Sequence, residues 1–288
     1  MSITGTSVVD RCRFENIGGG NGGEGLRAEN GTCNGQVTRC YFRECFNIAI
    51  HWLEQATGSS SLIEADTIKN VAIRPAYGSK MGTLHEKRTN LHYNGIAVSY
   101  GQNMRIRYNV TDSTGYAGIN LHDDNNTVEY NVINHGMVTL NDGGGIYCLT
   151  NNSTFRNNII LNTVGETWAG KMYGMNICHG LWLEYLHGYH DNKVINNTIA
   201  WNPQHGFWLP NNWNTTVTGN TCFGNRNDQM AVDAFEHPTT SNQGNTINQN
   251  IFFCETSDQV AFSWETGLNF GTMSGNWFCK PVYPPKFA

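Results

Sequence analysis

A carboxyl flanked by aromatic side chains is the first feature of this sequence that could do chemistry. Glu184 stands between Trp182 and Tyr185 in a short apolar segment. Aromatic neighbours exclude water from a carboxyl, which disfavours its charged form and raises its pKa. A carboxyl that stays protonated near neutral pH can donate a proton, so Glu184 is a candidate general acid.

An acid of this kind needs an ionised partner, and two aspartates are candidates. Asp142 precedes three glycines that would let a ligand approach the backbone, although an aspartate there also caps turns. Asp123 follows His122 two sequence repeats before Glu184, so about 9.6 Å would separate their positions on stacked strands. That spacing is near the one expected for two carboxyls with a water between them, although a polar turn is the alternative.

Side-chain alternation along short strands predicts which residues share an outward face with these acids. One outward column is expected to contain Asn120, Tyr147, Trp182, Trp208 and Asp233, with His122 and Glu184 beside it. Adjacent outward aromatics form either a platform for sugar rings or a surface packed beneath a covering loop. The residues predicted to contact a substrate are Trp182, Trp208, Tyr147, Asn120, His122, His205 and Asp233.

Two repeated patterns predict the elements that position these residues. In the first, an apolar residue is followed three places later by an asparagine, at Asn109, Asn131, Asn158, Asn197, Asn220, Asn250 and Asn276. In the second, a glycine starts a segment with apolar residues at alternate positions, as in Gly118 to Leu121. Both are short strands with one buried face, and the asparagines are expected to stack in one line inside the protein.

The repeat length predicts a single solenoid rather than several domains. The units of this second pattern, which start with Gly, Asn or Ala, begin at residues 25, 47, 70, 95, 118, 145, 180, 206, 231 and 261. We therefore expect an all-β, single-stranded right-handed parallel β-helix of about ten coils over residues 1–288. The long step from Gly145 to Gly180 predicts an inserted loop at 161–179, where Trp168, Lys171 and Tyr173 could line a groove.

Composition narrows the possible partners. Charged residues are 14% of the chain, the net charge is −5, and no basic run occurs, so nucleic acid is not an expected partner. No apolar stretch is long enough to span a membrane, and no CxxC pair indicates a metal. No secretory signal or capping helix precedes the first strand. We expect that upstream sequence, including an N-terminal cap, has been lost, which would allow an extracellular or periplasmic location.

Four segments resemble the repeats of carbohydrate-active right-handed β-helix proteins. They are Asp142-Gly-Gly-Gly-Ile-Tyr147, Arg156-Asn-Asn-Ile-Ile160, Gly180-Leu-Trp-Leu-Glu184 and Asn196-Asn-Thr-Ile199. This superfamily includes β-helix glycosidases, polysaccharide lyases and alginate epimerases. The resemblance implies an oligo- or polysaccharide substrate, and it implies that Asp142 and Glu184 occupy catalytic or substrate-contacting positions.

Three functions remain open at this stage. A glycoside hydrolase with two carboxylates and no cofactor is preferred, because the predicted outward face is rich in acids and aromatics and poor in Lys and Arg. A polysaccharide lyase or uronate epimerase would need a base and cations, including Ca²⁺ in some cases. A non-catalytic glycan-binding or structural β-helix would need neither. Whether two chains complete the site also stays open.

Overall fold

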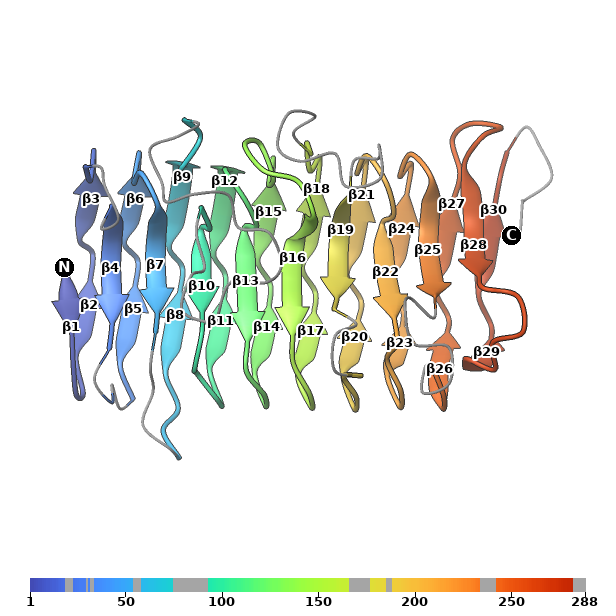
Figure 1. Cartoon of the computed structure of the whole chain (residues 1–288), viewed down its shortest axis with the longest axis horizontal. Helices are drawn as coiled ribbons and strands as arrows, with labels where there is room; N and C mark the ends of the chain where they lie inside the picture. Colours follow the sequence, from blue (N-terminus) through green and yellow to red (C-terminus); the bar gives the residue numbers. More distant parts are fainter. Residues whose placement is uncertain are drawn as a thin grey trace.

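In the computed structural model the described residues of the chain form a solenoid of three parallel β-sheets with ten strands each (Figure 1). The structure describes residues 1–18, 23–29, 31, 34–53, 58–74, 93–165, 177–184, 188–233 and 242–281. The first and last strands of the described chain lie at opposite ends of the stack (Figure 1). The expectation of an all-β parallel β-helix of about ten coils is confirmed. No helix among the described residues could span a membrane.

Each coil contributes one strand to each of three sheets, which we call A, B and C. Sheet A contains β1 (Ser2–Ile3), β4 (Glu24–Ala28), β7 (Ile48–Trp52), β10 (Ile96–Val98), β13 (Ile119–His122), β16 (Gly143–Leu149), β19 (Cys178–Leu183), β22 (Phe207–Pro210), β25 (Asp228–Asp233) and β28 (Val260–Trp264). Sheet B contains β2 (Val8–Asp10), β5 (Gln36–Thr38), β8 (Leu62–Glu64), β11 (Arg105–Arg107), β14 (Thr127–Glu129), β17 (Thr154–Arg156), β20 (Lys193–Ile195), β23 (Thr216–Thr218), β26 (Asn245–Asn248) and β29 (Gly271–Ser274). Sheet C contains β3 (Arg13–Glu15), β6 (Tyr41–Arg43), β9 (Thr67–Val71), β12 (Val110–Thr114), β15 (Val132–Asn134), β18 (Ile159–Leu161), β21 (Thr198–Ala200), β24 (Thr221–Phe223), β27 (Ile251–Phe253) and β30 (Trp277–Cys279).

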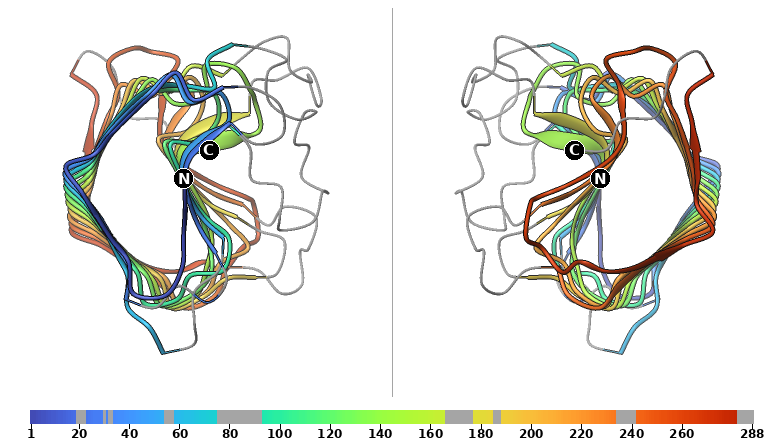
Figure 2. Two further views of the ribbon diagram at one scale, coloured as in Figure 1. Left: turned by 90° about the vertical axis from the view of Figure 1, so that its left-hand side faces the viewer. Right: turned by 90° about the vertical axis from the view of Figure 1, so that its right-hand side faces the viewer.

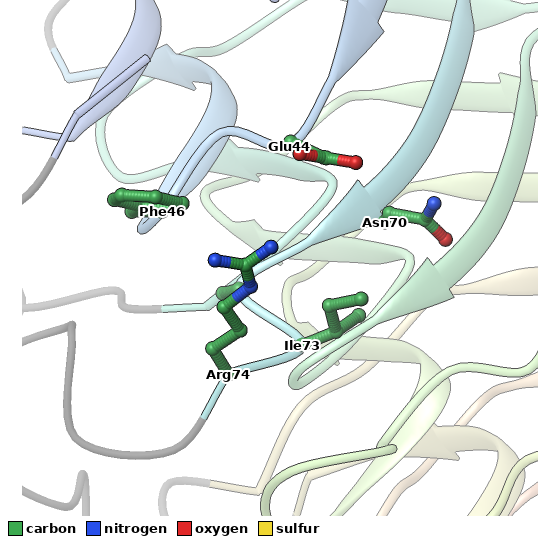
Figure 3. A pocket seen from close by; sticks show the side chains of 6 residues that line it. Glu44, Phe46, Asn70, Ile73 and Arg74 are labelled. Carbon is green, nitrogen blue, oxygen red and sulfur yellow. The ribbon is translucent and has the colours of Figure 1, made fainter. Parts of the chain in front are cut away.

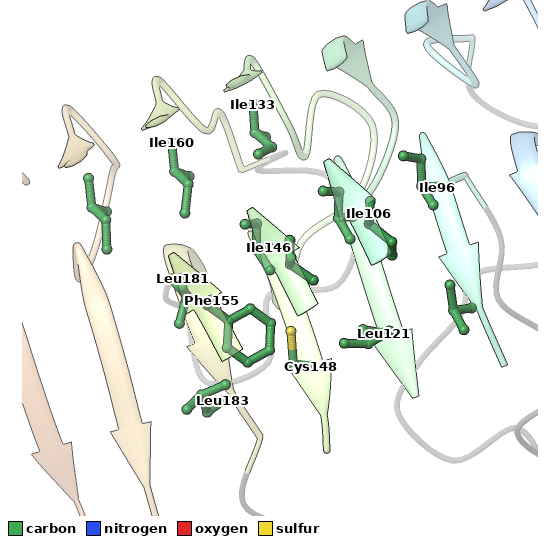
Figure 4. Close-up of a cluster of buried hydrophobic side chains, with 14 of the residues drawn as sticks. Ile96, Ile106, Leu121, Ile133, Ile146, Cys148, Phe155, Ile160, Leu181 and Leu183 are labelled. Atoms are coloured by element: carbon green, nitrogen blue, oxygen red, sulfur yellow. The ribbon is translucent and has the colours of Figure 1, made fainter. Parts of the chain in front are cut away.

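The strands of the three sheets surround the axis of the solenoid (Figure 2). Apolar side chains from all three sheets fill the interior (Figure 4). In sheet A, for example, Ile96 lies opposite Ile119 and Ile119 opposite Ile146 on successive coils. Side chains stack because parallel strands in register place equivalent residues about 4.8 Å apart. The alternation of apolar residues in the sequence therefore becomes one continuous core along the axis.

The seven ladder asparagines stack in one line at the corner between sheets B and C, as predicted. The Asn131 side-chain amide donates to Asn158 Oδ1 at 3.0 Å and to the Ile106 carbonyl at 2.9 Å. Its Oδ1 accepts from the backbone N–H of Asn109 at 3.0 Å. The same pattern of bonds repeats down the line to Asn276. Each amide thus satisfies backbone groups of a buried corner that would otherwise lack partners.

The same corner occurs in all ten coils, and in the first three Cys12, Cys40 and Asp66 take the place of the ladder asparagine. In each coil the residue before this position adopts the left-handed conformation. These residues are Arg11, Arg39, Ala65, Tyr108, Tyr130, Asn157, Asn196, Gly219, Gln249 and Gly275, with φ between 51° and 68°. Together with the ladder residue they form a two-residue corner that joins a strand of sheet B to the next strand of sheet C. Only two of the ten are glycine, so the corner is held mainly by the ladder bonds rather than by backbone freedom.

The N-terminal register differs from the sequence-based one in two places. The unit expected to begin at Asn70 is not part of sheet A, because Thr67–Val71 forms β9 of sheet C. Strand β7 pairs directly with β10, with Ile50 opposite Ile96, so His51 lies level with Ala97. The total of ten coils still holds because β1 supplies the remaining strand of sheet A.

Candidate functional site

The predicted aromatic column lies on the outward face of sheet A, but it is buried. Tyr147, Trp182 and Trp208 are 4%, 1% and 7% exposed and pack with Ala117 and Ala231 in a second apolar cluster outside the main core. The indole rings of Trp182 and Trp208 lie side by side, with centroids 4.6 Å apart. The expectation of a solvent-exposed platform is therefore wrong, and the alternative of a covered face is correct. Sequence periodicity predicts on which face of the sheet a side chain lies, but it does not predict whether other residues cover that face.

Glu184 follows β19 and is fully buried, and the phenol of Tyr147 on β16 donates a hydrogen bond to its Oε2. Burial and the negative charge of Glu184 raise the pKa of Tyr147 well above its usual value of 10. The phenol is therefore held in its protonated form. Tyr147 was expected to bind substrate, and the structure brings it into direct contact with the candidate catalytic carboxyl.

Asp142 does not face Glu184 across the strands. Gly143 lies opposite Cys178, so Asp142 is level with Ile177, seven residues before Glu184. Seven extended residues span about 23 Å. Strand β16 runs without a reversal from Gly143 to Leu149, so no sharp corner of this strand brings the two residues together.

Asp142 is connected to the pair through a second tyrosine that the sequence analysis missed. The Tyr116 phenol donates to the Asp142 carbonyl at 2.5 Å, and its ring lies 6.0 Å from that of Tyr147. Burial raises the pKa of Tyr116 well above 10, and the charges of Asp142 and Glu184 add to this effect. No repeat pattern marks Tyr116, because it precedes its strand at an irregular corner.

Asp123 caps the turn after β13, which is the alternative that the sequence left open. Its Oδ1 accepts from the backbone N–H of Asp124 at 2.9 Å and from Gln102 Nε2 at 3.2 Å. The neighbouring His122 is half-buried, and the edge of its ring lies against Tyr147 with centroids 6.2 Å apart. A catalytic role for Asp123 stays a prediction.

Asp233 ends β25 in a different column from the one expected. Trp208 lies opposite Ala231 and Pro210 opposite Asp233, so Asp233 belongs to the column of Glu184 and not to that of Trp208. Its Oδ2 accepts from Trp208 Nε1 at 2.6 Å. Burial raises the pKa of Asp233 above its usual value, and the Trp208 bond opposes this shift. Two coils separate Asp233 from Glu184, which corresponds to about 9.6 Å between equivalent backbone positions.

Two histidines stack beside the tryptophans. The rings of His179 and His205 are parallel, with centroids 5.0 Å apart, and His205 Nδ1 lies 2.5 Å from Asp228 Oδ2. The centroid of His179 also lies 4.6 Å from that of Trp208. His205 was a predicted site residue, whereas Asp228 was not. The only sequence signal for the histidine pair is that both residues directly precede a strand-leading glycine.

Asn120 is also buried on this face, 1% exposed, and lies opposite Tyr147. Among the described residues, no three His, Cys, Asp or Glu side chains converge as metal ligands would. Of the predicted inserted loop at 161–179, Leu161 belongs to β18, and Cys178 and His179 belong to β19. Trp168, Lys171 and Tyr173 lie outside the described residues.

A surface hollow lies away from this cluster. It is shallow and partly open to solvent (Figure 3). It is lined by Glu44, Phe46, Asn70, Ala72, Ile73 and Arg74. These residues lie beside sheet C, and none is a candidate site residue.

The family assignment follows from the sequence. The chain matches the family described as "Right handed beta helix region" over residues 2–180, which is more than half of its length, so it belongs to that family. The expected right-handedness of the coil is thereby confirmed. No curated protein sequence matches the chain.

Solved structures with the same fold include two mutants of the periplasmic alginate epimerase AlgG. One is 15% identical with a TM-score of 0.54 and covers 93% of this chain and 65% of its own. The other is 13% identical with a TM-score of 0.55 and covers 99% and 74%. The Dettilon tailspike protein is 14% identical with a TM-score of 0.48 and covers 88% and 42%. The chain thus spans less than two thirds of the first epimerase structure, and identities this low indicate a shared fold alone.

Proposed function

We propose that this β-helix acts on a uronic acid polysaccharide by proton transfer at the Tyr147–Glu184 pair, as a lyase or an epimerase. The observation that carries the proposal is the hydrogen bond from a buried phenol to a fully buried carboxyl on the outward face of sheet A. A buried carboxyl contributes nothing to coil stacking and costs free energy to desolvate. Such groups concentrate at sites of acid–base chemistry.

The two side chains have complementary roles in this proposal. Tyr147 keeps its proton because its pKa is raised, so it is the donor, and Glu184 is the acceptor. This reverses the role of general acid expected for Glu184 from sequence. Neither side chain is open to solvent, so the substrate reaches them in a conformation more open than this one.

The shared step of both reactions is removal of the C–H proton next to the sugar carboxylate. Glu184 takes that proton, and the electron pair passes to the carbon beside the carboxylate. In a lyase the neighbouring C–O bond then breaks, a C=C bond forms, and Tyr147 protonates the leaving oxygen. Because Tyr147 and Glu184 are in contact, they act on one side of the sugar ring. An epimerase needs a second proton donor on the opposite side, so the pair alone fits elimination better.

Asp233 could bind the carboxylate of the substrate in the absence of Lys or Arg. Burial raises the pKa of Asp233, and in its protonated form this carboxyl can donate a hydrogen bond to an anion. The alginate epimerases that share the fold act on a polymer of the kind proposed here, which supports the substrate class.

Glycoside hydrolysis is the second candidate, and the spacing of Glu184 and Asp233 favours it. Two carboxyls about 9.6 Å apart, one of them with a raised pKa, match the requirement for an acid and a base with a water between them. The described outward face from β13 to β25 carries histidines rather than Lys or Arg, which suits a neutral glycan.

Product analysis on alginate, pectin, xylan and cellulose tests the proposal. We expect ultraviolet-absorbing unsaturated ends, or deuterium incorporated beside the carboxylate in D₂O, from a uronate polymer. Glu184→Gln and Tyr147→Phe should each lower kcat at least 100-fold, because each removes one proton-transfer group. Glu265→Gln, at an exposed position after β28, is the matched control. New reducing ends without unsaturation or deuterium would assign the hydrolase, and full activity of Glu184→Gln would remove the pair from the chemistry.

A further inference from the structure

His179 is a buried polar side chain that the proposed chemistry does not use. It is 0% exposed, and neither ring nitrogen has a hydrogen-bond partner. One face of its ring stacks on His205, while Trp182 and Trp208 lie against it at centroid distances of 5.1 and 4.6 Å. On the opposite side its register partner is Gly144, which has no side chain.

An imidazole in this position destabilises the protein unless something binds it. Burial lowers the pKa of His179 well below 6.5, so the ring is neutral, with one N–H donor and one acceptor nitrogen. A buried polar group without a partner costs about 1–3 kcal/mol relative to a satisfied one. A phenylalanine is somewhat larger but has a flat ring that could also stack on His205, so ring stacking alone does not explain a histidine here.

Two further side chains on this face also have a buried polar atom without a hydrogen-bond partner. Trp182 Nε1 and Asn120 Oδ1 are buried and have no hydrogen-bond partner. The strands of Asn120 and Trp182 are two coils apart, which corresponds to about 9.6 Å. The ring of Tyr147 lies between them, 4.9 Å from that of Trp182. Together the three side chains offer an indole donor, an amide acceptor and an imidazole that does both, beside the Tyr147–Glu184 pair.

We propose that His179, Trp182 and Asn120 form a subsite that binds the hydroxyl groups of the sugar residue next to the reacting one. Hydroxyls fit this set because each can donate to Asn120 or His179 and accept from Trp182 or His179. A carboxylate accepts only and would leave Asn120 Oδ1 facing a like-charged oxygen, and a cation would leave the indole N–H unpaired. The subsite rests on the proposed function, because the proposed function places a carbohydrate on the outward face of sheet A.

The subsite should also determine which glycans bind, according to whether their hydroxyl groups are free. A buried group that hydrogen-bonds a substrate hydroxyl discriminates strongly against a substrate in which that hydroxyl is missing or blocked. We therefore expect the protein to prefer glycans with free hydroxyls over the same glycans after O-acetylation.

Binding of wild-type protein and His179→Phe to an oligosaccharide array of uronate and neutral glycans tests the subsite. We expect His179→Phe to bind at least 10-fold more weakly and to melt at the same or a higher temperature, because it removes an unsatisfied polar group without leaving a cavity. Asn120→Leu should weaken binding in the same way. Ser263→Ala, further along the column of Trp208, is the matched control and should bind normally.

The outcomes separate the subsite from the reaction. Unchanged affinity of His179→Phe together with a lower melting temperature would make His179 a structural residue and overturn the subsite, while turnover by wild-type protein would leave the proposed function standing. Weaker binding by His179→Phe without turnover of any glycan would keep the subsite and overturn the reaction. Failure of the wild-type protein to bind any glycan on the array would overturn both.

Discussion

Asp66 occupies a position in the asparagine ladder where an acid is chemically out of place. Its Oδ1 accepts from the Cys40 N–H at 2.6 Å, as a ladder asparagine would, but its Oδ2 has no partner. By the rule of the ladder, an amide nitrogen there would donate to the Val37 carbonyl. Burial raises the pKa of Asp66 from 3.8 to about 8, so the protonated acid takes the place of the amide at neutral pH.

Asp66→Asn should therefore stabilise the protein by an amount that depends on pH. The folded pKa of Asp66 lies above the unfolded one, so its protonated form supports folding fully below pH 3.8, and this support is lost as pH rises towards about 8. An asparagine cannot ionise, so the gain in melting temperature should be small at pH 4 and grow up to pH 8. A gain that does not change between these pH values would show that Asp66 does not titrate in this range.

The neighbours of a site residue could be predicted from sequence where they lie on the same strand or at the same level of the next strand. Tyr147 and Glu184 were expected beside each other on the outward face of neighbouring strands, and they are in contact. Tyr185, the other expected neighbour of Glu184, lies outside the described residues. The burial of Trp182 and Trp208 was not expected, because it depends on contacts outside the sheet that leave no period in the sequence. His179 precedes a strand-leading glycine, as His205 does, but it was not among the predicted site residues, because a sequence does not show which buried nitrogens lack a hydrogen-bond partner.

At the scale of the element, the corner between sheets B and C is the most predictable part of the molecule. Its asparagine recurs because one side chain must satisfy backbone groups on two coils. The assignment of strands to sheets failed where only apolar alternation, and no ladder asparagine, supported it. The Asn70 unit has the right apolar alternation, but alternation alone cannot tell a strand of sheet A from β9 of sheet C. Asp233 was assigned to the wrong column for a related reason, because a strand shifted by two residues keeps its alternation.

Breaking the ladder in the middle should cost much more than changing the residue beside it. Asn158→Ala removes the acceptor for Asn131 Nδ2 and for the Asn131 N–H, and it removes the donor to the Val128 carbonyl. We expect a loss of about 3 kcal/mol or more in the free energy of unfolding, because buried backbone groups become unsatisfied. Urea denaturation measures the change.

Asn157→Gly is the matched control for this prediction. Asn157 is the left-handed residue of the same corner, with φ of 55°, a conformation that glycine adopts without strain. It should change stability by a few tenths of a kcal/mol. Equal losses for the two variants would mean that corner conformation, and not the ladder bonds, stabilises the turn.

At the scale of the whole molecule, stability should be local because each coil packs mainly on its two neighbours. Phe155 on β17 is fully buried in the core near the middle of the stack (Figure 4). Phe155→Ala should cost about 3–5 kcal/mol and open the coils around it. In native-state hydrogen exchange, amides of β14 and β20 should lose more protection than those of β5.

Phe42→Ala provides the reciprocal test, because Phe42 is equally buried but lies on β6 near the N-terminal end. It should reduce protection in β5 and β8 and leave β20 and β23 nearly unchanged. If either variant lowers protection equally in all coils, the solenoid unfolds as one cooperative unit. The nearest-neighbour description would then be wrong, and the buried cluster on the outer face of sheet A would be a candidate for the additional coupling, because it joins side chains from β16, β19, β22 and β25.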